Sequence, residues 1–313
     1  MISTVPLSKT TQYIPVVCAA DDNYAMPLAV TARSILENLG EDKKLLLFVI
    51  DGGIKEHNKQ KIINSLDANR CDVKWLHPST DELLKKMKIS GHISVVAYYR
   101  FLIPEIISSE FEKVIYLDCD LVVNHDLSEL WELDLKDNYL LAVPEIRFPY
   151  LFQILPNFDK LGISSDCKYF NSGVLLINLQ KWRKDQIGLK AIQYVEQNIE
   201  YIVFHDQDAL NVVLAKQWGE LEPKWNQTPF IYDYSTWKDS PFQEEAFNDA
   251  VNDPCIIHFA SKHKPWNTYQ YRERDQKLFY KYLDMTAWAG MRFTLWMAIY
   301  KKLMRIILRN NKR

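Results

Sequence analysis

Apolar runs alternate with segments of helical periodicity along the first part of the chain. Residues 14–20 form a β-branched apolar run that ends in a polar turn, which predicts a buried strand. Further strands are predicted at 44–50 and 72–76, and helices at 24–39 and 55–69. Because strands and helices alternate through short connections, we expect a mostly parallel, doubly wound sheet of Rossmann-like topology.

The second part of the chain continues this alternation but is interrupted by two long segments. The pattern predicts helices at 97–107, 181–198 and 206–215, and strands at 113–117, 139–143, 173–178 and 254–259. Residues 148–167 and 225–252 are aromatic-rich and show no regular period. Long irregular segments inside a compact domain are more often functional loops than accidents.

Composition narrows the class of protein. Of the 313 residues, 48% are hydrophobic and 25% are charged, which predicts a packed globular chain. The net charge of −2 lacks the basic excess of a nucleic-acid-binding protein, so we expect no nucleic-acid partner. No GxGxxG motif follows the first strand, which argues against a dehydrogenase-type dinucleotide site. The five scattered cysteines form no CxxC pair and favour a reducing cytoplasm.

Two aspartates directly follow the apolar strand at 113–117. Asp118 and Asp120 are two residues apart, so in extended chain both carboxylates project to the same side. Open α/β sheets bind ligands at the carboxyl ends of their strands, and paired carboxylates suit Mg²⁺ or Mn²⁺. A surface turn with two solvated aspartates is the alternative, and the apolar strand ahead of the pair makes it less favoured.

A second polar group lies near the end of the predicted sheet. His258 sits in an apolar strand and could add a nitrogen ligand, which favours Mn²⁺ over Mg²⁺. Lys264, followed by Pro265 and Trp266, could offer an ammonium group to a diphosphate. Taken alone, a half-buried strand histidine and a surface lysine explain these residues better.

Two further motifs carry polar side chains next to regular elements. Asn171 and Ser172 precede Gly173, where the backbone can approach a ligand closely, although a simple turn explains this run as well. Asp206 and Asp208 open a predicted helix, and either one suits its N-cap. An N-cap accounts for one aspartate but not for the whole cluster.

Together these motifs resemble glycosyltransferase family eight, which includes the bacterial lipopolysaccharide galactosyl- and glucosyltransferases and, more distantly, glycogenin. The similar stretches occur in the family's order between about residues 14 and 268. They are Ala19–Tyr24, His92–Phe101, Tyr116–Asp120, Phe170–Leu179, Asp206–Asp208 and His258 with Lys264–Trp266.

The resemblance implies a fold and an activity. It implies the Rossmann-like nucleotide-diphospho-sugar transferase fold of type A for a catalytic domain at 14–270. An extension at 1–13 precedes this domain, and the residue pattern adds a helical basic tail at 271–313. The implied reaction is the retaining transfer of a hexose from UDP-glucose or UDP-galactose to a lipopolysaccharide, lipooligosaccharide or other cell-surface glycan. Mn²⁺ is the implied cofactor, with Mg²⁺ possible.

The resemblance also implies roles for individual residues. The implied metal ligands are Asp118, Asp120 and His258, and Lys264 would contact the diphosphate. The implied donor site also includes Ala19, Asp21, Asn23, Arg100, Cys119, Asn171, Ser172, Asp206, Gln207 and Ser261. Ser261 departs from the family, which usually has glycine there, so its part in phosphate binding is in doubt. His92 and Ile93 would lie in a loop facing the acceptor.

The mechanism of retention stays open at the sequence level. A double displacement needs a carboxylate beneath the sugar, and Asp206 is the one ionised neighbour that the motifs supply, with Gln207 a poor nucleophile. A front-face route, in which the leaving phosphate assists the acceptor hydroxyl, fits equally well. Asp206 and Gln207 are the expected catalytic residues in either case.

The C-terminal segment has two opposite faces at the helical angle. Its apolar arc includes Trp296, Ile299 and Ile306, whereas its basic arc includes Lys301 and Arg305. This pattern is typical of a helix lying on an anionic membrane surface, and the alternative is a helix docked on its own domain. We therefore expect residues 285–313 to hold the protein peripherally at the cytoplasmic face of the bacterial plasma membrane.

Two rival functions belong to other classes. A phosphatase of the haloacid dehalogenase type also places D-x-D after an apolar strand, but there the motif ends the first strand of the domain. A catalytically degenerate sugar-binding protein is the second rival, and the intact Asp118, Asp120, His258 and Lys264 argue against it.

Overall fold

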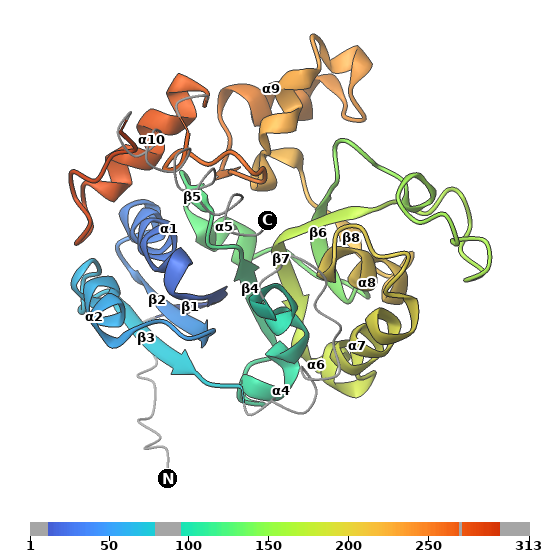
Figure 1. Ribbon diagram of the computed structural model, residues 1–313, viewed down its shortest axis with the longest axis horizontal. Coiled ribbons are helices and arrows are strands. Elements are labelled where there is room, and N and C mark those ends of the chain that lie inside the picture. The colour runs from blue at the N-terminus through green and yellow to red at the C-terminus, as the bar shows by residue number, and fades with distance from the viewer. Residues whose placement is uncertain (1–11, 79–94, 269–270, 295–313) are drawn as a thin grey trace, which may run out of the picture.

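The computed structural model describes residues 12–78, 95–268 and 271–294. Its centre is a seven-stranded sheet in the order β3-β2-β1-β4-β7-β6-β8 (Figure 1). Its strands are β1 (Gln12–Ala20), β2 (Lys43–Asp51), β3 (Cys71–Leu76), β4 (Lys113–Leu117), β6 (Leu140–Pro144), β7 (Phe170–Asn178) and β8 (Gly219–Glu220). Only β7 runs against its neighbours, so the predicted mostly parallel mixed sheet is confirmed.

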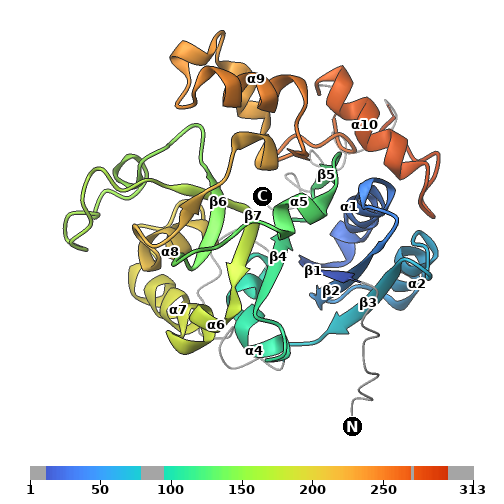
Figure 2. The same ribbon diagram turned by 180° about the vertical axis from the view of Figure 1, so that it is seen from behind.

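Helices cover both faces of this sheet. The α-helices are α1 (Ala25–Asn38), α2 (Glu56–Asn64), α4 (Ile103–Ile106), α5 (Leu127–Trp131), α6 (Leu179–Lys184), α7 (Ile187–Asn198), α8 (Asp206–Val213), α9 (Glu244–Asn252) and α10 (Glu273–Leu283). Short 3₁₀ helices are η1 (Asp22–Tyr24), η2 (Val95–Leu102), η3 (Leu151–Gln153), η4 (Pro223–Asn226), η5 (Pro229–Asp233) and η6 (Trp237–Asp239). In both Figure 1 and Figure 2, α10 lies beside α1.

The alternation of side chains along the strands builds a core on each face. On β1, Ile14 and Val16 join the cluster beneath α1 and α10, whereas Val17 belongs to the cluster beneath η2 and α7. On β4, Ile115 and Tyr116 divide in the same way. All five side chains are buried, as expected for a sheet covered on both faces.

Several predicted elements differ from the structure for local reasons. The helix predicted at 97–107 is the 3₁₀ helix η2 followed by the single turn α4, which has Pro104 at its start. The helix predicted at 181–198 breaks into α6 and α7, because Gln186 adopts a left-handed backbone with φ of 54°. Residues 244–252, predicted to be irregular, form α9.

The C-terminal part that the structure describes packs on the rest of the chain. Phe279 and Tyr282 of α10 are buried in the cluster that also contains β1 residues. Beyond α10, Trp288 is buried and its ring faces Lys61 of α2. Residues 295–313, which carry most of the predicted membrane-binding faces, lie outside the described residues. Among those that are described, no helix is long and apolar enough to cross a membrane.

A second sheet of two strands joins the segment after β4 to a distant part of the chain. Its strands β5 (Leu121–Val123) and β9 (Ile256–His258) pair antiparallel, with Leu121 opposite His258. Strand β5 was not predicted, because its three residues are too few to show a period. The pairing brings His258 beside the segment that follows β4, although the two are far apart in sequence.

Candidate active site

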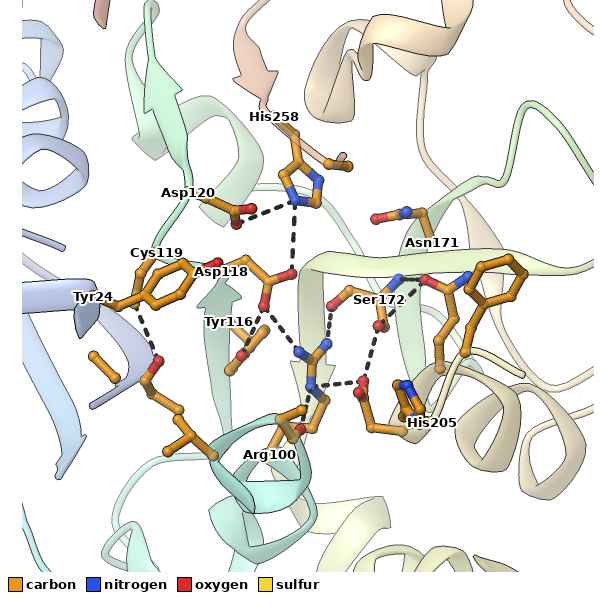
Figure 3. A pocket seen from close by; sticks show the side chains of 18 of the residues that line it. Tyr24, Arg100, Tyr116, Asp118, Cys119, Asp120, Asn171, Ser172, His205 and His258 are labelled. Carbon is orange, nitrogen blue, oxygen red and sulfur yellow. Dashed lines mark hydrogen bonds and ion pairs between the residues drawn. The ribbon is translucent and has the colours of Figure 1, made fainter. Parts of the chain in front are cut away.

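A cavity of about 390 Å³ lies where β1 and β4 end and β7 begins (Figure 3). Tyr24 and Cys119 lie at one side of the view, Asn171 and His205 at the other, and Asp118 with Arg100 between them. The predicted site residues that line the cavity are Ala19, Asp21, Arg100, Asp118, Cys119, Asp120, Asn171, Ser172, Asp206, Gln207 and His258. The four motifs therefore meet in one place.

Backbone and hydroxyl contacts fix the segment that carries the two aspartates. The amide of Asp118 donates to the carbonyl of Gly173 at 2.8 Å, which joins the end of β4 to the start of β7. The hydroxyl of Thr31 on α1 donates to the carbonyls of Cys119 and Leu121, at 3.0 and 2.8 Å. Because these contacts come from buried regular elements, the carboxylates sit on a rigid support.

Asp118, Asp120 and His258 converge to form a group that could hold a metal ion. The Nε2 atom of His258 lies 3.7 Å from Oδ2 of Asp118 and 3.4 Å from Oδ1 of Asp120. One potential ligand atom from each residue lies within 4.8 Å of the others, and no other group of this kind was found among the described residues. Two carboxylate oxygens and one imidazole nitrogen suit Mn²⁺.

A chain of amide side chains fixes which nitrogen of His258 faces the aspartates. The Nδ2 atom of Asn171 donates to Glu145 at 3.0 Å, so its oxygen can accept from Nδ2 of Asn226 at 2.8 Å. The oxygen of Asn226 then accepts from Nδ1 of His258 at 2.9 Å. With its proton on Nδ1, His258 presents the lone pair of Nε2 to the aspartates, as a metal-binding histidine must.

Gly173 keeps the space beside this group open. A Cβ atom at Gly173 would lie 2.3 Å from Cε1 of His258 and 2.9 Å from Oδ2 of Asp118. No side chain larger than hydrogen fits without displacing these residues. The open space and the donor set together fit a divalent metal ion held by Asp118, Asp120 and His258.

Lys264 contacts the same group from the loop after β9. Its ammonium pairs with Oδ2 of Asp120 and donates to the carbonyl of Phe259 at 2.6 Å. Burial alone would raise the pKa of the Asp120 carboxyl, but the ammonium of Lys264 outweighs it and holds that pKa below its usual range. Asp120 is therefore ionised throughout the physiological range.

Arg100 lies at the floor of the cavity, and its nitrogens contact other groups of the protein. Its Nη2 lies 2.9 Å from Asp118, its Nε 3.0 Å from Asp206, and its Nη1 2.6 Å from the carbonyl of Ser172 (Figure 3). The guanidinium also stacks over the ring of Tyr116, 4.5 Å from its centre. Arg100 thus joins the metal-type group to Asp206.

Asp206 and Gln207 lie at the mouth of α8, but neither Asp206 nor Asp208 caps the helix. The N-cap is His205, whose φ of 54° and ψ of −114° are unusual for a residue other than glycine. The carboxylate of Asp206 accepts a hydrogen bond from the hydroxyl of Ser172 at 3.1 Å, and that of Asp208 accepts from the backbone amides of residues 203 and 204. Burial raises the pKa of Asp206 to about 6, although Arg100 opposes this.

Gln207 is held between two parts of the wall. Its side-chain oxygen accepts from the amide of Ser172 at 3.0 Å, and its nitrogen donates to the hydroxyl of Tyr169 at 3.1 Å. Gln207 is therefore positioned by the start of β7, and it lines the cavity next to Asp206.

Some predicted residues lie elsewhere. Asn23, Ser261 and Lys264 do not line the cavity; Asn23 donates its backbone amide to Asp21, and Ser261 bonds the carbonyl of His263. His92 and Ile93 lie outside the described residues. The wall residues Tyr24, Tyr116 and His205 stand in or directly beside the motifs but had no predicted role, and Glu145, Arg147 and Phe204 belong to no motif.

Known proteins share both the sequence pattern and the fold. A family model described as glycosyl transferase family 8 matches residues 15–270. General stress protein A of Bacillus subtilis is 33% identical over 279 residues, which span 87% of this chain and 94% of that protein. A lipopolysaccharide 1,2-glucosyltransferase of Escherichia coli is 30% identical over 251 residues, 79% of this chain and 71% of that protein.

A solved structure agrees with this similarity. The galactosyltransferase LgtC, crystallised with donor and acceptor sugar analogues, superimposes with a TM-score of 0.72 at 29% sequence identity. The match covers 90% of this chain and 97% of that one. The expected type A transferase fold is thereby confirmed.

Proposed function

The chain belongs to glycosyl transferase family 8, and on that premise we propose that it is a Mn²⁺-dependent, retaining hexosyltransferase that uses UDP-glucose or UDP-galactose. The observation that carries this proposal is the meeting of Asp118, Asp120 and His258 at one cavity, with Lys264 paired to Asp120 from outside the cavity lining. A phosphatase of the haloacid dehalogenase type is excluded by the family and by the position of the aspartates after the fourth strand.

The donor is proposed to lie along the cavity from Tyr24 towards Asp206. The uridine would contact Ala19 and Asp21 at the end of β1, as the family resemblance implies. Its diphosphate would meet Lys264 beside the metal ion, which when bound supplies positive charge to the leaving oxygens. Asn23 and Ser261, which lie outside the cavity lining, are proposed as rim contacts only.

The sugar would then lie over Arg100, next to Asp206 and Gln207. The bond between the anomeric carbon and the phosphate oxygen breaks, and the electron pair stays on UDP. The acceptor hydroxyl oxygen bonds the anomeric carbon, and its proton passes to a phosphate oxygen of the leaving UDP. Lys264 would stabilise the negative charge that develops on the diphosphate, and the carboxylate of Asp206 would stabilise the positive charge at the anomeric carbon.

The contacts that Asp206 makes with Arg100 and Ser172 favour this front-face route over a double displacement. Oδ2 of Asp206 forms an ion pair with Nε of Arg100 at 3.0 Å and accepts a hydrogen bond from the hydroxyl of Ser172. A carboxylate oxygen held by an ion pair and a hydrogen bond is a weak nucleophile, but it remains a negative charge fixed beneath the sugar. We therefore assign Asp206 an electrostatic role, with Gln207 positioned beside it.

The acceptor is proposed to be a lipopolysaccharide, lipooligosaccharide or other cell-surface glycan. The names of the Escherichia coli relative and of LgtC support a glycan acceptor. We further propose that the reaction occurs at the cytoplasmic face of the plasma membrane, with the basic tail in contact with anionic lipid.

A panel of nucleotide sugars tests this proposal. Purified protein is incubated with UDP-, GDP- and CMP-sugars, with Mn²⁺ or with a chelator, and nucleotide release is measured. We expect release from UDP-glucose or UDP-galactose that requires the metal. Release from a GDP- or CMP-sugar alone, or equal release in chelator, would contradict the assignment of donor or cofactor.

A further inference from the structure

Arg147 stands in the wall of the cavity on the strand-β6 side, and the proposed donor site makes no use of it. It follows β6 by three residues and lines the cavity together with Glu145, Phe204 and His205. Its side chain is 33% exposed, so it is partly screened from water yet open to a ligand. It was not among the residues that the sequence motifs identified.

Aromatic rings hold the guanidinium of Arg147. Its Cζ atom lies 3.7 Å from the ring centre of Phe230, 5.3 Å from that of Phe148 and 5.6 Å from that of Phe204. Stacking of this kind fixes the plane of the guanidinium without using its hydrogen-bond donors. The nearest carboxylate is Glu145, but Nε of Arg147 is 3.4 Å from its oxygen, which is a long contact.

The two arginines of the cavity differ in which of their nitrogens remain available to a ligand. Arg100 contacts two carboxylates and two carbonyls, so each of its three nitrogens already has a partner. Neither terminal nitrogen of Arg147 has a hydrogen-bond partner within the described ranges. Arg147 therefore offers a planar pair of donors into a cavity whose other charged walls are mostly acidic.

The position of Arg147 points to the acceptor and not to the donor. Its neighbour Phe204 adjoins His205, which lies at the opposite side of the cavity from Tyr24 (Figure 3). If the uridine lies by Ala19 and Asp21, and the diphosphate by Asp118 and Asp120, the side with Arg147 faces the incoming hydroxyl. This step rests on the proposed function.

We propose that Arg147 selects an acceptor sugar that carries an anionic group, a carboxylate or a phosphate monoester, next to the accepting hydroxyl. Both groups present two oxygens in the geometry that a guanidinium binds with paired hydrogen bonds. Phe204, which lines the cavity with its ring centre 6.0 Å from that of Phe148, offers apolar surface to the sugar ring beside that group. A neutral acceptor would leave the two terminal nitrogens of Arg147 without an anionic partner.

Matched pairs of acceptors test this inference. Methyl glucoside and methyl galactoside are compared with the corresponding uronic acids, and separately with their 6-phosphates, in UDP release above the rate without acceptor. We expect the anionic member of at least one pair to be favoured about 10- to 100-fold in kcat/KM, as for a charge-assisted bidentate contact. The two arms distinguish a carboxylate acceptor from a phosphorylated one.

Substitutions at Arg147 connect the preference to this residue. In Arg147→Gln the ratio of anionic to neutral kcat/KM should fall close to one, and Arg147→Lys, which keeps the charge but loses the fork, should lie between. Lys168→Gln is the matched control. Lys168 lies on the same β6–β7 connection as Arg147, and the substitution removes an exposed cation that is paired with Glu220 of β8. A thermal unfolding curve for each variant establishes that it is folded.

The outcomes separate this inference from the proposed function. Wild-type protein that releases UDP but treats both members of every pair alike, or favours the neutral one, would overturn the role of Arg147. A preference that survives in Arg147→Gln would overturn it too. Wild-type protein that releases no UDP from any donor would instead count against the proposed function.

Discussion

A relay of polar side chains decides how His258 meets the two aspartates. The chain from Glu145 through Asn171 and Asn226 leaves Nε2 of His258 facing the carboxylates. The sequence predicted the aspartates, because their spacing after a strand has a geometric meaning. It could not predict Asn226, which lies 32 residues before His258 in a 3₁₀ helix and belongs to no motif.

Replacing Asn226 by Ala should weaken metal binding although Asn226 is not a ligand. Without the acceptor on Nδ1, the imidazole can rotate or change tautomer, and losses of about 10- to 100-fold are usual for such partners. Mn²⁺ binding is measured by electron paramagnetic resonance in the presence of UDP, with Asn198→Ala, on the outer end of α7, as the control. Unchanged Mn²⁺ affinity in Asn226→Ala would contradict the relay.

Replacing Ser172 by Ala should move the acidic limb of the activity profile to higher pH. The hydroxyl of Ser172 donates to Asp206 and lowers its pKa, whereas burial raises that pKa to about 6. Without the donor the ionised form is less stable, so the pKa of Asp206 rises further, by about one unit for a hydrogen bond to a charge. The check is kcat/KM for the donor against pH.

The direction of that shift decides the outcome. Activity of Ser172→Ala should begin to fall at a higher pH than in the wild type, while Ser164→Ala, an exposed serine beside Asp166, should follow the wild-type profile. A limb that stays in place or moves to lower pH would show that ionised Asp206 is not required.

At the scale of elements, tight helix packing positions Arg100. Helix α7 approaches η2 so closely that a Cβ atom on Gly188 would lie 1.9 Å from the carbonyl oxygen of Phe101, next to Arg100. Periodicity predicted helical structure for both segments but not this contact or their breaks. Those depend on Gln186 and on the 3₁₀ geometry of η2, which tertiary packing imposes.

Gly188→Ala should therefore reduce both stability and activity. The backbone of η2 must move to admit the methyl group, and overpacking of this kind costs about 1–3 kcal/mol. The displaced Arg100 would then hold Asp118 and Asp206 less well. Urea unfolding and Mn²⁺-dependent UDP release are measured beside Gln193→Ala, an exposed position on the same helix. Wild-type values for both in Gly188→Ala would show that the contact is unimportant.

Across the whole molecule, the order of motifs predicted the fold better than it predicted the site walls. The alternation of strands and helices gave the parallel part of the sheet, and the reversed strand β7 brings Asn171 and Ser172 to the same edge as Asp118. The wall residues Glu145, Arg147 and His205 come from connections, whose paths depend on packing across the molecule. No local pattern encodes that.

The tail beyond the described residues should bind anionic membranes. Because Trp288 packs on the domain, the comparison is between the full chain and one that ends at Thr294, which keeps that contact. Co-sedimentation with anionic vesicles should drop for the shorter chain. Each basic residue near the anionic surface contributes about 1 kcal/mol to binding, and added salt should weaken this electrostatic part only. Equal binding by both chains would contradict the membrane role.

The anomeric configuration of the sugar at transfer tests the central claim most directly. UDP-glucose or UDP-galactose is incubated with protein and Mn²⁺, the metal is removed, and the first-formed product is observed by nuclear magnetic resonance, with Asp120→Asn and a metal-free sample beside it. The account predicts an α-configured product, formed by wild-type protein with the metal and lost in both controls. A β-configured product, or an equal yield without the metal or in Asp120→Asn, would contradict it.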